Sequence, residues 1–170
     1  MKKIHLFIML CMISFNVNAQ IQRTFYGLEF NLASKQQVVN KLKKMGKSIV
    51  VNKADEVTVN NLELADCKWA KVSFCFKDDK FVAILLQSKK YSLAEKSDAY
   101  LKSKSIGSVL NMKYKDYSIS DRTGLSLYKD DNTISFFYVD ENRVQVNRFV
   151  LMYADGNLLS EMLSKMQSEL

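Results

Sequence analysis

The chain has 170 residues and carries 25 basic and 18 acidic side chains, which gives it a formal net charge of +7. This length is enough for one domain with a sizeable core. Its five glycines are scattered singly, so the glycine-rich loop that cradles phosphate groups is excluded.

Residues 1–19 have the pattern of a secretory signal peptide. Two lysines precede an apolar stretch over residues 4–15, and small residues lead up to a predicted cleavage after Ala19. The apolar stretch is shorter than the roughly 20 residues that a membrane-spanning helix needs. A lipid-attachment site at Cys11 is disfavoured because Leu10 before it is too large. We therefore expect a periplasmic or secreted protein.

Cleavage would change the chemistry that the chain can offer. The mature chain would have 170 − 19 = 151 residues, and its formal charge would fall from +7 to +5 with the loss of Lys2 and Lys3. The single histidine, His5, would also be lost. Histidine triads, histidine–zinc sites and histidine general bases are then excluded.

The first half of the mature chain opens with an expected extended lead-in over residues 20–33, bent at Gly27. A helix is predicted next, because Ser34 and Gln37 form a capping box in which each side chain binds a backbone N–H of the other. Its apolar stripe, which ends before Gly46, consists of Val38, Val39, Leu42 and Met45. Its lysines are interpreted as a solvated face, in preference to a patch for anionic lipid or nucleic acid.

Strands are predicted at 48–52 and 57–64, followed by a hairpin of 68–77 and 80–86 around the two-residue turn Asp78-Asp79. In that register one face receives the apolar pairs Phe76/Phe81, Phe74/Ala83 and Val72/Leu85. The other face is half polar, with Cys75/Val82, Ser73/Ile84, Lys71/Leu86 and Trp69/Ser88. The asymmetry is typical of an antiparallel sheet that helices cover on one side.

The second half repeats this order of elements. A capping box of Ser92 and Glu95 opens a helix through Leu101, with a continuation to Met112 past a break near Gly107 as an alternative. The strands predicted after it are 114–119, 125–129, 133–139 and 144–153. Asn157 is expected to cap a last helix with the apolar stripe Leu158, Leu159, Met162, Leu163 and Met166.

These elements predict an α+β fold, a long antiparallel β-sheet with helices on one face, built as tandem helix-plus-four-strand repeats. The half-repeats span approximately 20–90 and 91–156, and a C-terminal helix follows over 157–170. Residues 20–170 are expected to form a single domain.

Two sets of structural residues resemble known exported proteins. Phe25-Tyr-Gly-Leu-Glu-Phe30 running into Ser34-Lys-Gln-Gln-Val38 and Leu42 resembles the opening of repeats in proteins similar to the β-lactamase inhibitory protein. Similarity to exported bacterial proteins of unknown function lies in Leu64–Cys67, Val72–Phe74, Lys80–Val82 and Tyr100–Lys102. The resemblance implies a tandem helix-and-sheet module that offers a sheet face to a protein partner. It transfers no functional residue, and it does not assign β-lactamase as the target.

The charged and sulfur-containing side chains do not predict an active site. The neighbouring carboxylates Asp78/Asp79, Asp130/Asp131 and Asp140/Glu141 fall at predicted hairpin tips, where aspartate serves turn geometry. We therefore expect no enzyme, no cofactor and no bound metal. Cys67 and Cys75 are too far apart on one continuous strand for a disulfide, so free thiols are favoured unless a turn near Lys68 joins them.

The half-polar face is the predicted interaction site. Trp69 and Lys71 share it in the first half. If a three-residue loop joins the last two strands, Tyr128, Phe137, Val139 and Phe149 share a face in the second. That second-half face lies opposite Leu125, Leu127, Ile134, Phe136 and Tyr138. Aromatic side chains beside a cation are enriched at protein interfaces. The predicted partner-binding residues are thus Trp69, Lys71, Tyr128, Phe137 and Phe149, with a protein and not a nucleic acid as partner.

Two alternatives compete with this hypothesis. A loop, the last helix or a second subunit could cover the same face, in which case the aromatic residues belong to a core. A groove between the sheet and its helices could instead make the protein a periplasmic carrier of a small apolar ligand.

Overall fold

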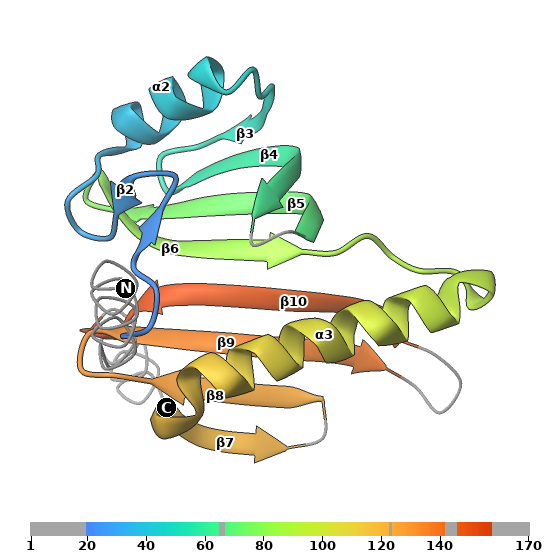
Figure 1. Ribbon diagram of the computed structural model, residues 1–170. Coiled ribbons are helices and arrows are strands. Elements are labelled where there is room, and N and C mark those ends of the chain that lie inside the picture. Colours follow the sequence, from blue (N-terminus) through green and yellow to red (C-terminus); the bar gives the residue numbers. More distant parts are fainter. Residues whose placement is uncertain (1–19, 65–66, 123, 142–145, 158–170) are drawn as a thin grey trace, which may run out of the picture.

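The computed structural model describes residues 20–64, 67–122, 124–141 and 146–157, and they form an α+β fold around one eight-stranded antiparallel sheet (Figure 1). The predicted fold class is therefore confirmed. The strand order is β3-β4-β5-β6-β10-β9-β8-β7. The strands are β3 (Ile49–Asn52), β4 (Glu56–Leu64), β5 (Cys67–Lys77), β6 (Lys80–Gln87), β7 (Ser118–Arg122), β8 (Leu125–Lys129), β9 (Thr133–Glu141) and β10 (Val146–Asp155).

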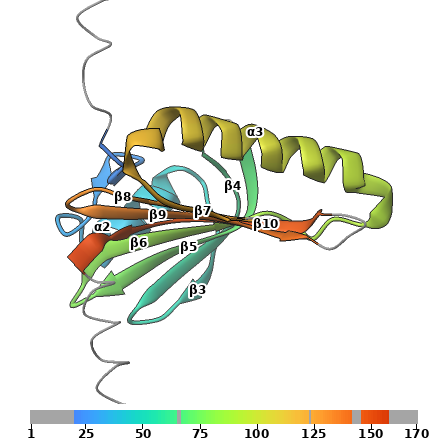
Figure 2. The same ribbon diagram turned by 90° about the horizontal axis from the view of Figure 1, so that it is seen from below.

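Two helices precede the two groups of four strands, α2 (Lys35–Lys44) before β3 and α3 (Lys96–Tyr114) before β7. Seen edge-on, α3 lies along one face of the second-half strands (Figure 2). Short 3₁₀ turns flank α3, η2 (Leu93–Glu95) and η3 (Lys115–Tyr117). The last strands of the two groups, β6 and β10, pair at the middle of the sheet. A duplication as the origin of this order stays a prediction.

The predicted turn between β5 and β6 is confirmed. Asp78 and Asp79 have φ angles of 49° and 61°, as a two-residue hairpin turn requires. Lys77 lies opposite Lys80 and Phe76 opposite Phe81. Further along the hairpin the predicted register is wrong, because Cys75 pairs with Ala83 and leaves Val82 as an extra residue in β6.

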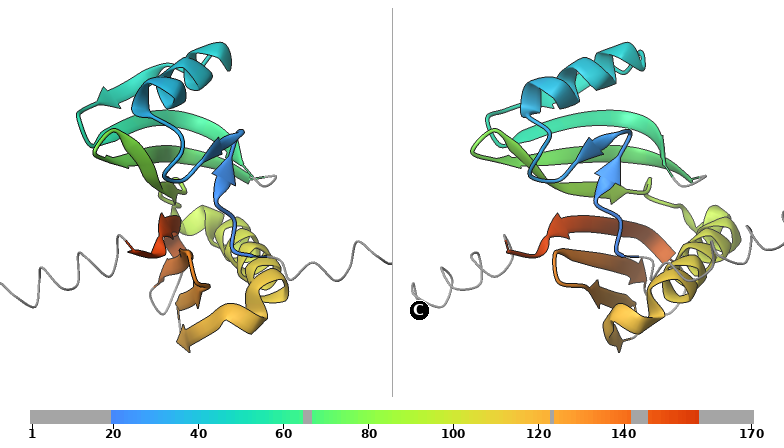
Figure 3. Two further views of the ribbon diagram at one scale, coloured as in Figure 1. Left: turned by 90° about the vertical axis from the view of Figure 1, so that its left-hand side faces the viewer. Right: turned by 60° about the vertical axis from the view of Figure 1, so that its left-hand side comes forward.

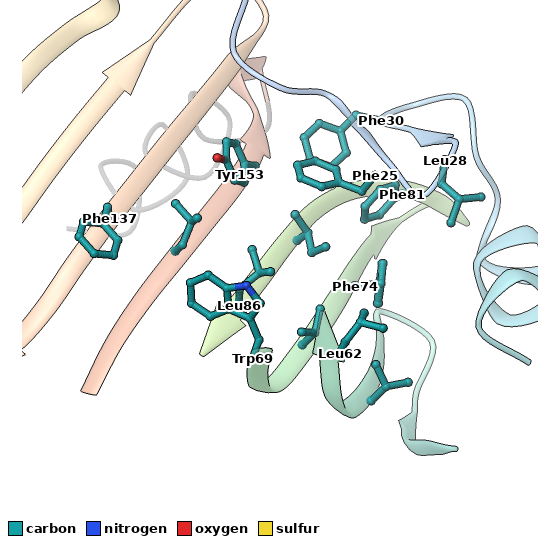
Figure 4. Packing of buried hydrophobic residues seen from close by; sticks show 14 of the residues in the cluster. Phe25, Leu28, Phe30, Leu62, Trp69, Phe74, Phe81, Leu86, Phe137 and Tyr153 are labelled. Atoms are coloured by element: carbon teal, nitrogen blue, oxygen red, sulfur yellow. The ribbon is translucent and has the colours of Figure 1, made fainter. Parts of the chain in front are cut away.

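This bulge exchanges the two faces of β6. Phe74 lies opposite Ile84 and Val72 opposite Leu86, where we expected Ala83 and Leu85. The core face of the hairpin, part of which Figure 4 shows, consequently holds Val72, Phe74, Phe76, Phe81, Ile84 and Leu86.

A second interruption places Trp69 in the core. Val57 and Val59 of β4 are buried, but the next buried residue is Leu62, so strict alternation breaks between them. Asn61, with a φ of 53°, marks the irregularity. Leu62 pairs with Trp69, and both side chains are 1% exposed. Trp69 is therefore in the core while Lys71 is exposed, although the two residues are two positions apart on β5 and simple alternation would place them on the same face.

The lead-in closes one end of the sheet. It forms a small hairpin of β1 (Thr24–Phe25) and β2 (Leu28–Glu29), bent at Gly27 as predicted. The ring centroid of Phe25 lies 5.1 Å from that of Tyr153 on β10, and Phe30 lies 4.8 Å from Phe81 on β6. The blue segment in Figure 3 accordingly runs from the upper half of the sheet to the lower half.

Both helical segments begin at their predicted capping boxes, and α2 ends before Gly46 as predicted, whereas α3 ends later than expected. In α2 the Gln37 backbone N–H donates to Ser34 Oγ (3.3 Å) and the Ser34 N–H donates to Gln37 Oε1 (2.8 Å). Helix α3 runs through Gly107 without the predicted break and ends at Tyr114, so the strand predicted at 114–119 begins only at Ser118. Burial of Tyr114 against Tyr128, with ring centroids 5.9 Å apart, outweighs its preference for strands.

The burial of Phe149 leads to a first prediction. Phe149→Ala should lower the free energy of unfolding by about 3–5 kcal/mol, because it leaves a cavity among packed rings. Lys71→Ala, on the exposed side of the same sheet, should change it by no more than about 0.5 kcal/mol. Urea unfolding followed by circular dichroism measures both. Similar small effects of the two substitutions would contradict the burial of Phe149.

Candidate functional site: a groove between helix α3 and the sheet

The structure brings the predicted aromatic residues together but does not leave them open. Register confirms that Tyr128, Phe137, Val139 and Phe149 share one face of the second half. Helix α3 covers that face, and Trp69, Tyr128, Phe137 and Phe149 are 1%, 2%, 3% and 0% exposed. The expectation of an open aromatic face is therefore wrong, and of the five predicted residues Lys71 alone is exposed.

Phe149 is the centre of the buried aromatic group. Its ring centroid lies 5.7 Å from Trp69, 5.9 Å from Tyr91 and 6.3 Å from Phe137. The indole N–H of Trp69 donates to the Leu64 carbonyl oxygen at 3.2 Å, which satisfies its polar atom inside the core. These rings stabilise the junction of the two halves of the sheet.

A groove of about 560 Å³ lies beside this aromatic group, between α3 and the strands β8 and β9. Its helix wall consists of Ser103, Lys104, Gly107, Ser108 and Asn111. Its sheet side consists of Gly124, Leu125, Ser126, Tyr128, Phe137, Val139 and Glu141. Two of the predicted site residues, Tyr128 and Phe137, therefore form part of its floor.

The groove exists because α3 presents small residues to this part of the sheet. Its large buried anchors, Leu110 and Tyr114, lie toward one end of the helix, whereas Ser103 and Gly107 face the region above β9. A Cβ atom added to Gly107 would lie 3.5 Å from Phe137 Cε1, which is an ordinary van der Waals contact. Because Gly107 also lines the groove, a side chain longer than a methyl group would extend into it.

The lining combines an aromatic floor with a polar rim. Hydroxyl groups come from Ser103, Ser108 and Ser126, and Asn111 supplies an amide. Lys104 and Glu141 add one positive and one negative charge. Among the described residues that line the groove there is no histidine, cysteine or aspartate, and Glu141 supplies their one carboxylate. An apolar floor with a few polar groups around it is the usual composition of a small-molecule binding site.

The sequence contained only an indirect signal of this groove. The apolar residues of α3 have irregular spacing, and several of them, Leu101, Val109 and Met112, are exposed. Four small residues among positions 103–108 of a predicted helix were the available clue, but they do not tell which strands the helix crosses.

The two thiols lie outside the groove, on β5. Cys67 and Cys75 are unpaired and half-buried, which confirms the prediction of free thiols. Burial raises the pKa of both. For Cys75 the pKa rises to about 11, because the carboxylates of Glu56 and Asp55 add to the effect of burial.

Within the described ranges, no three His, Cys, Asp or Glu side chains are grouped so that they could hold a metal ion. The same part of the chain contains no helix with the length and apolar character needed to cross a membrane.

No family model matches this chain, and searches of curated proteins and of solved structures likewise find no match. The resemblance to β-lactamase inhibitory proteins accordingly stays a prediction.

The close approach of α3 to Phe137 predicts the effect of Gly107→Ala. Alanine should raise the free energy of unfolding by about 0.5–1 kcal/mol, because it favours the helix and its methyl group makes an ordinary contact. Gly46→Ala is the control and should destabilise, because Gly46 has a φ of 69°. Urea unfolding measures both, and a loss of stability in Gly107→Ala would show that no space exists above Phe137.

The raised pKa of Cys75 predicts slow alkylation. Iodoacetamide reacts with the thiolate, so at about pH 8 the Cys75 thiol should react far more slowly than an exposed cysteine. The rate should still be rising at about pH 10, because the pKa is about 11. Mass spectrometry of peptides separates Cys75 from Cys67. A rate that levels off below about pH 9 would contradict the assignment.

Proposed function

We propose that this chain is an exported, non-enzymatic binding protein that holds one small amphipathic molecule in the groove between α3 and strands β8 and β9. The observation that supports this proposal is the groove itself. Its volume of about 560 Å³ falls within the range of small-molecule sites, roughly 300–1,000 Å³. Its lining also has the usual composition, an apolar floor with a few polar groups around it.

The lining favours a particular class of ligand. The rings of Phe137 and Tyr128 and the side chain of Val139 suit an apolar ring or a short alkyl group. The hydroxyl and amide groups of the rim suit hydrogen-bonding substituents on the same molecule. Lys104 and Glu141 balance one another in charge, so the ligand is uncharged or zwitterionic rather than a polyanion such as a nucleotide.

This proposal develops the carrier alternative of the sequence analysis. The interaction-module hypothesis depended on an open aromatic face, and helix α3 covers that face. Export is proposed on the pattern of residues 1–19, which lie outside the described residues. The absence of catalysis is proposed because the groove's polar groups are mainly hydroxyls and an amide.

The test uses N-phenyl-1-naphthylamine, an uncharged aromatic amine whose fluorescence rises in apolar surroundings. Wild type should bind it at one site. Gly107→Leu, which places a leucine side chain in the groove, should weaken binding at least about tenfold, a loss of roughly 1.4 kcal/mol. Ser105→Leu places the same side chain on α3 away from the groove and should leave binding unchanged.

A variant on the opposite face separates groove binding from adsorption to the sheet. Phe136→Ser changes a half-exposed aromatic residue on the side of the sheet that α3 does not cover. Binding should survive this substitution. If Phe136→Ser abolishes binding while Gly107→Leu has no effect, the probe occupies the sheet surface and the groove is not the binding site.

A further inference from the structure

The side of α3 that faces away from the sheet carries a large share of the exposed apolar side chains. Among the described residues nine large apolar side chains are exposed, and five of them lie on η2 and α3: Leu93, Tyr100, Leu101, Val109 and Met112. Met112 is 76% exposed and Leu101 is 66% exposed. A surface helix normally turns charged and polar residues outward. The outward apolar residues of α3 therefore indicate an interaction surface.

Three of these residues belong to one continuous stripe. Residues three or four positions apart on a helix are neighbours on its surface. Leu101 is followed at such spacings by Ser105, then by Ser108 and Val109, and then by Met112. We call these five residues the crest of α3. All five are exposed, and they extend along about 17 Å of the helix.

The crest lies opposite the side by which α3 packs on the sheet. The buried residues of the helix are Ala99, Ser103, Leu110 and Tyr114. Leu110 comes about two and a half helical turns after Leu101 and therefore lies on the opposite side. Figure 2 shows α3 as the outermost described element on its side of the sheet. Apolar residues on two opposite sides of the helix also explain its irregular apolar spacing.

Lysine side chains flank the crest. Lys102 and Lys113 lie on one flank and Lys104 lies on the other, and all three are exposed. Lys102 also pairs with Asp98 at 3.0 Å. Between residues 89 and 117 the chain has seven lysines and three acidic residues, which gives this segment a net charge of +4. The apolar stripe is thus set in a positively charged surface.

This combination favours an anionic lipid surface over a protein as the partner. Helices that lie in a membrane interface combine an apolar side with lysines, whose alkyl chains follow the apolar surface while their ammonium groups stay in the polar layer. Protein interfaces are depleted in lysine, and stable ones use roughly 20–30 residues a side. The crest has five residues, two of which are serines.

We propose that the crest of α3 docks reversibly on an anionic lipid surface, with Leu101, Val109 and Met112 among the headgroups and the flanking lysines near the lipid phosphates. Docking requires no ligand in the groove, because the groove lies on the inner side of the same helix. The last helix predicted over 157–170 lies, apart from Asn157, outside the described residues and is not part of the proposed surface.

The test measures co-sedimentation with sucrose-loaded vesicles. It uses residues 20–170, which contain every described element, because the apolar stretch of residues 4–15 would itself bind lipid. At low ionic strength, vesicles that contain phosphatidylglycerol should bind the protein at least about tenfold more strongly than vesicles of phosphatidylcholine alone, since each lysine near an anionic surface contributes about fivefold. Equal binding to the two kinds of vesicle would contradict recognition of anionic lipid.

Two matched pairs of variants locate the binding surface. Leu101→Ser should weaken binding to the phosphatidylglycerol vesicles at least about fivefold. Leu32→Ser removes a leucine that is 68% exposed on the lead-in and should leave binding unchanged. Lys113→Glu should also weaken binding at least about fivefold. Lys43→Glu makes the same change in net charge on α2 and should have an effect of no more than about twofold.

Ser105→Leu enlarges the apolar stripe and should strengthen vesicle binding about tenfold. A gain in Ser105→Leu together with a loss in Leu101→Ser excludes unfolding as the cause of both. Leu101→Ser should bind N-phenyl-1-naphthylamine as the wild type does, so a failure of the groove and a failure of the crest are distinguishable. Equal effects within either matched pair would overturn the proposal. No binding of wild type or Ser105→Leu to either kind of vesicle would also overturn it and would leave a protein as the partner of the crest.

Discussion

One extra residue in β6, Val82, determines which side chains of this protein face the helices. The bulge returns Ile84 and Leu86 to the side of Phe81, and their partners on β10 are Tyr153 and Leu151. In the pairing of β10 with β9, Leu151 lies opposite Phe137 and Tyr153 lies opposite Ser135. The side chains of these β9 residues therefore point to the same face of the sheet as Ile84 and Leu86. Without the bulge, the core of the first half and the aromatic group of the second half would lie on opposite faces.

This dependence explains which parts of the fold could be predicted. The turn at Asp78-Asp79, the capping boxes and the shared face of Tyr128, Phe137 and Phe149 follow from local rules, namely turn chemistry, cap chemistry and alternation. The bulge at Val82 leaves no mark in the pattern of apolar residues, because Val82, Ala83, Ile84 and Leu85 are all apolar. The irregularity at Asn61 does interrupt the alternation, between Val59 and Leu62, but it lies on β4 and does not by itself indicate that Trp69 on β5 faces the core.

The candidate site shows a different limit. Alternation along β8 to β10 identifies two sets of residues, but both sets are aromatic and aliphatic. The choice between them depends on where α3 lies, and α3 has apolar residues on several sides, with Leu101, Val109 and Met112 exposed. The groove also depends on the small size of Ser103 and Gly107. A small residue in a predicted helix does not by itself indicate a groove, because it can be present for other reasons.

The position of β10 has a consequence for how the chain must fold. This strand ends at residue 155 of 170, yet it pairs with both β6 and β9 at the middle of the sheet. Until it is in place, the first four strands and the next three form two separate ribbons, each with an unpaired hydrogen-bonding edge. Their union waits for contacts between residues far apart in sequence, which slows folding. During synthesis, the edges of β6 and β9 are therefore open to pairing with another chain until β10 is in place.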